Sequence, residues 1–380
     1  MLTPWLELPG VAERIGRLGE LIGLDLLTLG TTAGAEEIQD TAVTQPLIVT
    51  LGLIAAGELD LAGHGPDGSS AVVLAGHSVG EITAAGVAGV LGTDEAVALA
   101  ARRGAEMAAA CALTPSGMSA LLGGDPDVVV AAVEALGLTP ANRNGAGQVV
   151  AAGALDALAE LAANPPAGSR VRPLAVAGAF HTTYMATAQD ALKGYVAALH
   201  PHSPQHLLLS NSDGTTVASG DDFLARLVAQ ITRPVRWDLC QQNLTDLGVT
   251  AVIELPPAGT LVGLAKREMP GVQTLAIKSP ADLDAARSLI SSHFQHGQGQ
   301  HTPEFQLVAA PVKGIFTRTD GLVEGQPVTR GTQVGVVRTN RDEHPVIASS
   351  AGVLAEWLRH DGDIVGAGLP VARINSGSEF

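Results

Sequence analysis

Residues 71–91 read AVVLAGHSVGEITAAGVAGVL, a strand-like run joined to a helix-like run by a tight turn. The apolar residues 71–76 predict a buried strand, and the alanine-rich residues 81–91 predict a helix. The turn between them, GHSVG at residues 76–80, is a G-x-S-x-G pattern, which lifts a serine hydroxyl out of the backbone. A chance glycine–serine turn is the alternative interpretation. In its strand-to-helix context, the stretch predicts an α/β fold with a parallel sheet and a nucleophile, Ser78.

A nucleophilic serine needs an oxyanion site and a base. The helix predicted to begin beside Ser78 aims its free N–H groups at the serine, and the N–H of Val79 is the expected oxyanion donor. The candidate base is His181, in GAFH at residues 178–181. A lone histidine is usually structural, so the assignment of His181 as the base depends on the motifs that accompany it. An α/β-hydrolase arrangement would instead place an acid and then a histidine late in the chain.

The region 117–177 has a pattern of its own. Strands are predicted at 118–122, 139–142, 148–152 and 171–177, and helices at 126–136 and 154–163. This β-α-β-β-α-β order is typical of a ferredoxin-like subdomain. The α/β pattern resumes at residues 251–254 and 274–277. We therefore expect an α/β core into which a ferredoxin-like subdomain is inserted.

The polar stretch HFQHGQGQHTPE, residues 293–304, lacks periodicity and predicts a linker. Beyond it, short β-like runs alternate with glycine-containing turns, and the G-x-x-V-x-x-G-x-x-V pattern of residues 325–334 recurs at 362–371. Two copies of one β unit predict a small all-β domain with pseudo-twofold symmetry. Over residues 307–374 this region resembles the biotinyl/lipoyl carrier domain, a barrel-sandwich fold, and we place the domain at 305–374.

The carrier-domain resemblance lacks its reactive residue. In that family a modified lysine lies on the hairpin between the two repeats, and aligning the flanking glycines Gly331 and Gly352 puts Arg341 at that position. Arginine cannot form the amide bond to biotin or lipoate. The only lysine of the region, Lys313, lies in its first predicted strand. The resemblance therefore implies the fold without a swinging arm.

Composition limits the classes of function. The 380 residues are 46% hydrophobic and 16% charged, which allows a sizeable core in one large or two domains. The net charge of −16 argues against nucleic acid as a partner. The N-terminus shows no signal peptide, and the apolar stretch 46–57 is too short to span a bilayer. Cys111 and Cys240 have no metal-type spacing and predict small core residues in a reducing cytoplasm.

An acidic protein partner would need a local basic patch on this acidic chain. Five basic residues could supply one: Arg170, Arg172, Lys266, Arg267 and Lys278. The sequence does not show whether they meet in space.

Several short motifs occur together in one order. They are TQP (44–46), GHSVGE (76–81), RRG (102–104), NRNGAGQVVAAG (142–153), GAFH (178–181) and PVRW (234–237). With them, residues 1 to about 290 resemble the malonyl-CoA:acyl carrier protein transacylase family, and its actinobacterial members most of all. The resemblance implies an α/β-hydrolase-like acyltransferase core, which we place at residues 1–292 with its subdomain at about 117–177.

By position, the resemblance assigns the reacting groups. Ser78 would be the nucleophile, His181 its general base and acid, and Gln230 would offer a carbonyl that orients the imidazole. Without the family, Gln230 would be an ordinary amide at a helix end. Arg103 would pair bidentately with the free carboxylate of a malonyl group, a task that suits its planar fork. Without the family, Arg102 and Arg103 would be an exposed helix face.

The resemblance also implies residues that line the pocket. Gln45 would lie near the acyl group, and its alternative is a helix amide before Pro46. Phe180 would narrow the pocket against an α-methyl group on the acyl chain, with plain core packing as the alternative. Asn144 and Gln148 match the family's N-x-x-x-Q pattern and are expected to be structural or pocket-lining.

The implied reaction is a ping-pong transfer for fatty-acid or polyketide synthesis. Ser78 would take malonyl from malonyl-CoA, and the phosphopantetheine thiol of acyl carrier protein would receive it, with no metal or bound cofactor. A serine thioesterase or esterase is the alternative with the same nucleophile. Arg103 distinguishes the two, because a hydrolase needs no cation for a carboxylated acyl group. A further, non-enzymatic alternative concerns the C-terminal β domain, which would either dock partners or only join the products of two adjacent genes.

The chain departs from the family pattern at its start. Family members open with a strand and G-Q-G-x-Q, whose first glutamine helps to form the oxyanion hole, and residues 1–5, MLTPW, correspond to the segment that follows. Loss of one oxyanion donor typically costs about 10²–10³ in rate. We expect either a start site further upstream or a truncated acyltransferase of low activity.

Overall fold

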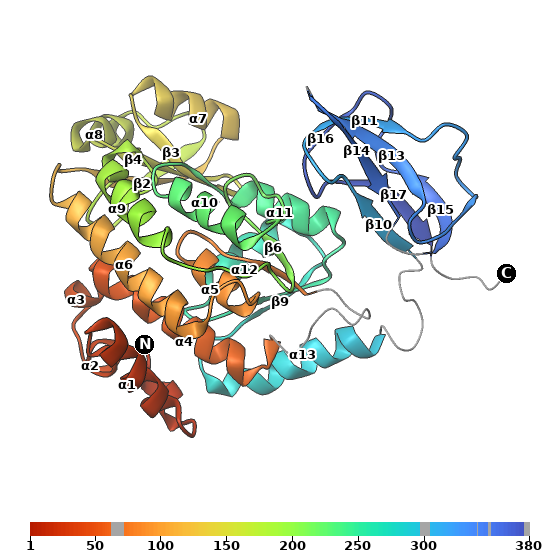
Figure 1. The fold of residues 1–380 in the computed structure, drawn as a ribbon. Helices are drawn as coiled ribbons and strands as arrows, with labels where there is room; N and C mark the ends of the chain where they lie inside the picture. The colour runs from red at the N-terminus through yellow and green to blue at the C-terminus, as the bar shows by residue number, and fades with distance from the viewer. Residues whose placement is uncertain (62–71, 297–304, 340, 349–350, 376–380) are drawn as a thin grey trace. The chain divides into compact units, whose positions relative to one another are not determined.

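The structure is a computed structural model that describes five segments of the chain: 1–61, 72–296, 305–339, 341–348 and 351–375 (Figure 1). The described residues divide into two compact units, one up to Ile290 and one from Ser291 onward. The first unit is mixed α/β and contains the predicted nucleophile. The second unit begins with the last residues of the helix that ends at His296, and the rest of its described residues form strands and turns.

Helices and strands alternate through most of the first unit. Its α-helices are α1 (Val11–Ile22), α2 (Leu26–Thr31), α3 (Ala35–Gln39), α4 (Thr41–Glu58), α5 (Gly80–Val87), α6 (Thr93–Cys111), α7 (Pro126–Ala135), α8 (Leu155–Ala163), α9 (Ala186–Val196), α10 (Gly220–Gln230), α11 (Trp237–Asp246), α12 (Thr260–Glu268) and α13 (Leu283–His296). Its strands are β1 (Val73–Ala75), β2 (Gly117–Gly123), β3 (Thr139–Gly145), β4 (Gln148–Gly153), β5 (Ser169–Pro173), β6 (Leu207–Leu209), β7 (Val235–Arg236), β8 (Ala251–Glu254) and β9 (Gln273–Ala276). Short 3-10 turns span Thr3–Glu7, Thr183–Met185 and Pro280–Asp282.

The α/β core contains two pairs of parallel strands. β1 pairs with β6, with Leu74 opposite Leu208, and β8 pairs with β9, with Ile253 opposite Leu275. The strands are parallel, as the sequence predicts, but among the described residues they form two pairs rather than one sheet. They are short and only partly buried, whereas the strands of a continuous parallel sheet are usually covered on both faces.

Two long helices form the centre of the first unit. α4 and α6 pack along each other (Figure 1), and the largest apolar cluster includes Leu47, Ile54 and Leu99 from these helices. α4 is longer than the apolar stretch 46–57, and by length and composition it could cross a membrane, but 61% of it is buried inside the protein. Because α4 is apolar all round and covered by protein, we assign it as a core helix.

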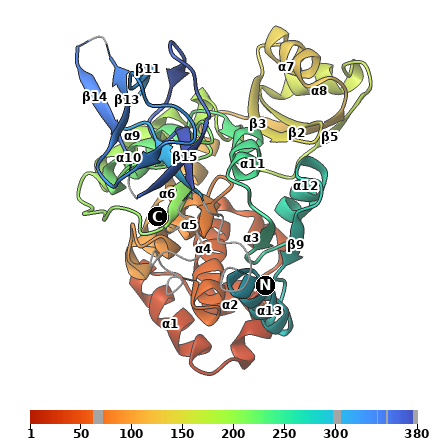
Figure 2. The ribbon, with the colours of Figure 1, turned by 90° about the vertical axis from the view of Figure 1, so that its right-hand side faces the viewer.

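The subdomain predicted at 117–177 follows the predicted order of elements, β2-α7-β3-β4-α8-β5. Strands β5-β2-β4-β3 pair antiparallel in that order, and β7 adds to β3 in parallel. Helices α7 and α8 cover one face of the sheet (Figure 2). The other face carries Met118, Ala120 and Val150, which pack with Phe180. That second face is therefore the one that meets the predicted active site.

The edge strand of this sheet is shorter than predicted. β5 ends at Pro173, whereas the sequence predicts a strand over residues 171–177. Proline has no N–H to donate to a neighbouring strand, and residues 174–177 are exposed. The N–H of Leu174 still donates to the carbonyl oxygen of Met118 at 3.0 Å, and the chain leaves the sheet after it and runs to His181.

The second unit consists of two four-stranded sheets. One has the order β10-β17-β15-β12 and the other β14-β13-β11-β16. The strands are β10 (Phe305–Ala309), β11 (Gly314–Arg318), β12 (Pro327–Val328), β13 (Gln333–Arg338), β14 (Glu343–Ile347), β15 (Gly352–Trp357), β16 (Ile364–Val365) and β17 (Pro370–Asn375). The two copies of the repeat share local structure, since Gly325 and Gly362 have φ values of 87° and 93°, and Val334 and Val371 are both fully buried. The all-β character predicted for this region is confirmed.

Helix α13 runs into the predicted linker 293–304. The helix continues to His296, so residues 293–296 are helical rather than irregular. These four residues, HFQH, contain no glycine or proline that would stop a helix, and Gly297 is the first such residue. The rest of the predicted linker, 297–304, lies outside the described residues.

Candidate active site

Ser78 lies in a strained turn between β1 and α5. Its φ is 53°, a left-handed value that residues other than glycine rarely adopt. Gly76 is required for the turn, since an added Cβ would collide with the backbone of Gly80 and Glu81. Gly80 is not required in the same way, because an added Cβ there would meet open space. Of the two glycines in the pattern, only Gly76 therefore permits the turn sterically.

The side chains of Ser78 and His181 face each other. Ser78 Oγ lies 2.8 Å from His181 Nε2, and His181 Nδ1 lies 2.8 Å from the backbone carbonyl oxygen of Gln230. A carbonyl oxygen can only accept, so Nδ1 carries the proton and Nε2 is left to accept from the serine hydroxyl. Gln230, the last residue of α10, thus orients the imidazole through its main chain.

The surroundings keep the imidazole of His181 neutral. The side chain is 3% exposed, and burial, followed by the positive charge of Arg103, lowers its pKa to about 3. The hydrogen bond to Gln230 opposes this shift but does not cancel it. At neutral pH the Nε2 atom is therefore free to take a proton.

Arg103 reaches the same point from α6. The residue is 1% exposed, and its Nη2 lies 3.4 Å from Ser78 Oγ. It donates to two amide oxygens, from Nη1 to Gln45 Oε1 at 2.7 Å and from Nη2 to Gln230 Oε1 at 2.6 Å. Within the described residues its Nε has no partner and no carboxylate forms an ion pair with it. Burial lowers the pKa of Arg103 to about 10, so the guanidinium remains charged at neutral pH.

The neighbouring Arg102 does not enter the site. Its side chain is 47% exposed and pairs with Glu106, one turn further along α6, at 2.8 Å. The interpretation of these two arginines as an exposed helix face therefore holds for Arg102 alone.

The other predicted pocket residues lie around this centre. Gln45, on α4, is 4% exposed and uses Nε2 to donate to Thr41 Oγ1 at 2.7 Å while its oxygen holds Arg103. The N–H of Val79, just before α5, makes no hydrogen bond in the part of the chain that the structure describes. Phe180 is partly buried against both the helical core and the subdomain sheet.

Asn144 and Gln148 connect the subdomain to the serine turn. His77 Nε2 lies 2.8 Å from Asn144 Oδ1, and Asn144 Nδ2 donates to Gln148 Oε1 at 2.8 Å. The imidazole of His77 also packs edge-on against Trp237, with ring centroids 5.7 Å apart. Of the two roles predicted for Asn144 and Gln148, these contacts favour the structural one.

Two buried polar residues that the sequence does not single out complete the site. Glu81 is 2% exposed, and its Oε1 accepts from the backbone N–H of Asn211 while its Oε2 accepts from Gln230 Nε2, both at 2.6 Å. Asn211 in turn donates from Nδ2 to the carbonyl oxygen of Gly76 at 2.6 Å. Burial raises the pKa of Glu81 to about 7, against the opposing effect of its hydrogen-bond donors. The sequence signal for Glu81 was an acid at the start of the apolar run EITAAGV, because an acid buried with that run requires hydrogen-bond partners.

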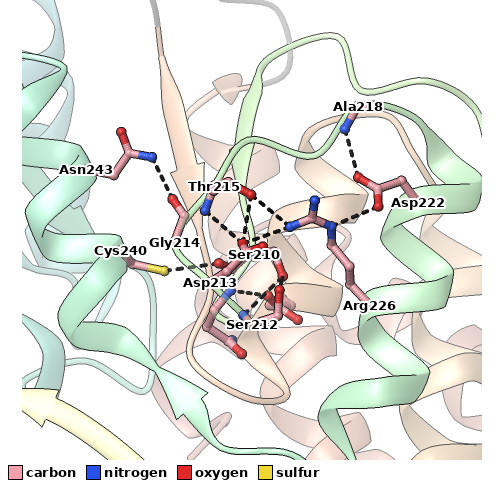
Figure 3. Close-up of polar contacts among 12 residues, drawn as sticks. Ser210, Ser212, Asp213, Gly214, Thr215, Ala218, Asp222, Arg226, Cys240 and Asn243 are labelled. Carbon is pink, nitrogen blue, oxygen red and sulfur yellow. Dashed lines mark hydrogen bonds and ion pairs between the residues drawn. The ribbon is translucent and has the colours of Figure 1, made fainter. Parts of the chain in front are cut away.

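Arg226 stabilises the loop that contains Asn211 through hydrogen bonds to other residues of that loop (Figure 3). Arg226 Nη1 donates to Asp213 Oδ1 at 2.8 Å and to Thr215 Oγ1 at 2.9 Å, and its Nε donates to Asp222 Oδ1 at 2.8 Å. Because Arg226 and Asp222 belong to α10, the same helix that ends at the site also fixes this loop.

The basic residues that could form one patch lie on different elements. Arg170 and Arg172 are both exposed on β5, whereas Lys266 and Arg267 are on α12 and Lys278 follows β9. No group of three or more His, Cys, Asp or Glu side chains that could hold a metal ion occurs within the described residues.

A strained serine on a strand-to-helix turn, facing a neutral histidine on an α/β scaffold, is the arrangement that an enzyme with a serine nucleophile requires. Residues 17–285 match the family described as acyl transferase domain. The malonyl CoA-acyl carrier protein transacylase of Mycolicibacterium smegmatis is 57% identical over 293 residues, which cover 76% of this chain and 100% of that protein. The chain belongs to the acyl transferase domain family, among the malonyl CoA-acyl carrier protein transacylases.

Solved structures give the same result for the fold. The crystal structure of MCAT from Mycobacterium tuberculosis is 54% identical, with a TM-score of 0.72 over 75% of this chain and 94% of that one. A malonyl-transacylase, PlMCAT, solved with its type II PKS acyl-carrier protein, is 28% identical, with a TM-score of 0.69 over 76% of this chain and 94% of that one. The first unit thus has the acyltransferase α/β fold.

Proposed function

We propose that this chain transfers malonyl from malonyl-CoA to the phosphopantetheine thiol of acyl carrier protein, for fatty-acid or polyketide synthesis. The observation that carries the proposal is Arg103, a buried cation whose described hydrogen bonds go to neutral acceptors: the Ser78 hydroxyl at 3.4 Å and the amide oxygens of Gln45 and Gln230. A buried charge without a carboxylate partner is costly, and the carboxylate of a malonyl group would supply one. A simple ester or thioester hydrolase has no use for this cation.

In the first half-reaction, Ser78 Oγ attacks the thioester carbonyl and His181 Nε2 takes the hydroxyl proton. The negative oxygen of the tetrahedral intermediate is stabilised by the free N–H of Val79 and the N-terminal end of α5. The carbon–sulfur bond then breaks, and the CoA sulfur leaves with the proton from His181. A malonyl ester on Ser78 remains.

The malonyl group is held at its other end by Arg103. Its carboxylate displaces the amide oxygens of Gln45 and Gln230 from the two Nη atoms, an exchange that favours the ionised acceptor. Phe180 bounds the pocket and disfavours a branch on the acyl chain. In the second half-reaction the carrier thiol gives its proton to His181 and attacks the ester, and Ser78 Oγ recovers that proton as it leaves.

The substitution Arg103→Ala tests this assignment, with Arg102→Ala as its matched control. We expect Arg103→Ala to lower kcat/KM for malonyl-CoA by about 100-fold or more, because a charged hydrogen-bond pair is lost. Loading of acetyl-CoA should be retained or increased, which also shows that the variant folds. Arg102→Ala should match the wild type for both acyl groups. An unchanged preference for malonyl in Arg103→Ala would contradict the proposal.

A surface for the carrier protein lies on the exposed edge of the subdomain. Arg170 and Arg172 are paired opposite Leu122 and Ala120 of β2, and residues directly opposite in an antiparallel pair share a face. Ala120 belongs to the cluster that contains Phe180, so the two arginines project from the face of the sheet that meets the site. They can attract an acidic carrier without taking part in the chemistry.

Charge reversal tests this surface separately from the site. We expect the combined change Arg170→Glu and Arg172→Glu to raise KM for the carrier protein by about 10-fold while leaving malonyl loading from malonyl-CoA unchanged. Arg17→Glu, on the exposed face of α1, is the control and should change neither value. An unaltered KM for the carrier in the double variant would rule out this surface.

For the second unit we propose a biotinyl/lipoyl-like barrel-sandwich over residues 305–374, joined to a transferase domain at 1–292 that contains a ferredoxin-like subdomain at about 117–177. The support is the repeated glycine–valine pattern and the two four-stranded sheets that it forms. Arg341 stands where a carrier lysine would, so the domain serves as an attachment or docking module without a prosthetic group. A cytoplasmic location fits the free thiols of Cys111 and Cys240.

A further inference from the structure

The side-chain amide of Gln230 is held in one orientation because its oxygen faces a hydrogen-bond donor and its nitrogen faces acceptors. Its oxygen accepts from Arg103, which can only donate, and its Nε2 donates to Glu81 at 2.6 Å. Nε2 also reaches Asn211 Oδ1 at 3.1 Å and the carbonyl oxygen of Ser78 at 3.2 Å. The backbone of this same residue orients His181. The position of Gln230 therefore affects both the guanidinium and the imidazole.

Both carboxylate oxygens of Glu81 face donors. Oε1 faces the N–H of Asn211 and Oε2 faces the amide nitrogen of Gln230, each at 2.6 Å. Ser210 also forms a side-chain hydrogen bond with Glu81. An ionised carboxylate can accept from all of these donors, whereas a protonated one loses its negative charge and uses one acceptor position for its own proton. The hydrogen bonds to Asn211 and Gln230 then become neutral and weaker. Because Asn211 also binds the carbonyl of Gly76, this weakening loosens the frame around Ser78.

We propose that Glu81 is a positioning residue for acyl transfer which works only as a carboxylate, clamping Gln230 to the Asn211 loop, and that its protonation releases this clamp. The inference rests on the proposed function, since it concerns how the same site is kept ready. Burial raises the pKa of Glu81 to about 7, which puts the change in the neutral range.

The titratable groups around Glu81 do not change charge in that range. Arg103, on α6, stays positive with a pKa of about 10, and His181 stays neutral with a pKa of about 3. The thiol of Cys240, on α11, stays protonated because burial raises its pKa well above the usual value. A change in activity near pH 7 would therefore report on Glu81 rather than on the histidine.

The test is the pH dependence of Ser78 acylation in single turnovers, for the wild type and for Glu81→Gln. Malonyl-pantetheine is the acyl donor, because it has no phosphate that titrates in the range. We expect the wild-type rate to rise by about 10-fold between pH 5.5 and 8, since the hydrogen bonds to Glu81 are again made to a charged group. Glu81→Gln, which imitates the protonated acid, should be independent of pH and equal to the wild type at pH 5.5.

Charge repulsion alone predicts that the acylation rate falls as pH rises, because ionised Glu81 would repel the malonyl carboxylate. A wild-type rate that is flat or falls with pH overturns the proposal, and so does a Glu81→Gln variant as fast as the wild type at pH 8. If Glu81→Gln does not fold, the wild-type profile alone decides. Absence of any malonyl ester on wild-type Ser78 would instead refute the proposed function, so the two failures are distinguishable.

Discussion

The serine turn of the first unit and the β13–β14 connection of the second are both short connections to which a resemblance to a known family draws attention. At the serine turn, Ser78 contacts His181 and Arg103, which come from distant parts of the chain. At the β13–β14 turn, the hydrogen bonds are local: the N–H of Thr339 donates to the carbonyl of Asp342 at 2.8 Å, and the N–H of Asp342 donates to Thr339 Oγ1 at 3.0 Å. Arg341 stands exposed beside them.

The difference lies in burial and in the origin of the partners. The polar groups at the serine turn are excluded from water, and this burial raises the pKa of Glu81 and lowers the pKa of His181. The charged pair that flanks the other turn, Arg338 and Glu343, is 64% and 53% exposed and adds little. A turn becomes a reactive site when distant elements enclose it, and the turn pattern alone does not achieve this.

The largest effect is expected where the serine turn itself is blocked. In Gly76→Ala the added methyl group collides with the backbone of Gly80 and Glu81, so the turn cannot form and acyl transfer should be abolished, with a loss of roughly 3 kcal/mol or more in the free energy of unfolding. Gly80→Ala is the matched control, because its methyl group meets open space and the residue is in a helix that favours alanine. Chemical denaturation and malonyl loading measure both. Equal tolerance at the two glycines would mean that the turn is not as tight as described.

An effect of intermediate size is expected from the buried histidine. His181 has a pKa of about 3 when folded and about 6.5 when unfolded, so between these values only the unfolded chain binds the proton. Its contribution to stability is therefore lost as pH falls below 6.5, by about 2–3 kcal/mol at pH 4.5. Glu81 acts in the opposite sense, since its raised pKa makes stability fall as pH rises from 4.5 to 7.

Comparing the pH dependence of unfolding in the wild type and in His181→Asn isolates the contribution of the histidine, because Glu81 is present in both proteins. Unfolding free energies at pH 7 and pH 4.5 should show a steeper loss in the wild type than in the variant. Histidine NMR should find one imidazole neutral down to pH 4.5. A histidine at this site that titrates near pH 6.5 would refute the burial argument.

The smallest effect is expected at the exposed turn. Arg341→Ala should change the free energy of unfolding by no more than about 0.5 kcal/mol, since the hydrogen bond described for Arg341 uses its backbone N–H. Malonyl transfer should equal that of the wild type within error. A clear loss of transfer would mean that the second unit takes part in the reaction. The claim that only the serine turn matters for malonyl transfer would then be wrong.

Much of the site could be predicted from the sequence, because short motifs specify residue types and their order. Ser78, His181, Arg103 and Gln230 converge as the resemblance implies. Glu81 was not predicted, since an acid in the first turn of a helix has an ordinary explanation in the helix dipole. The apolar residues that follow Glu81 are the one local signal of its burial, and the structure shows that it is buried.

The same limit applies to other contacts made over long distances in sequence. Asn211 comes two residues after the end of a short strand and is the second of several polar residues in a loop, which resembles any exposed turn. The division of the parallel strands into two pairs was missed for a related reason, since periodicity predicts strands but does not say which strands are neighbours. Partners that depend on tertiary packing leave no local pattern.

The most direct measurement is the mass of the chain after exposure to malonyl-CoA in the absence of carrier protein. We predict one added malonyl group on the peptide that contains Ser78, its removal when carrier protein with a free phosphopantetheine thiol is added, and no addition in Ser78→Ala. A malonyl group on another residue, or rapid release of free malonate in place of a stable ester, would contradict the account.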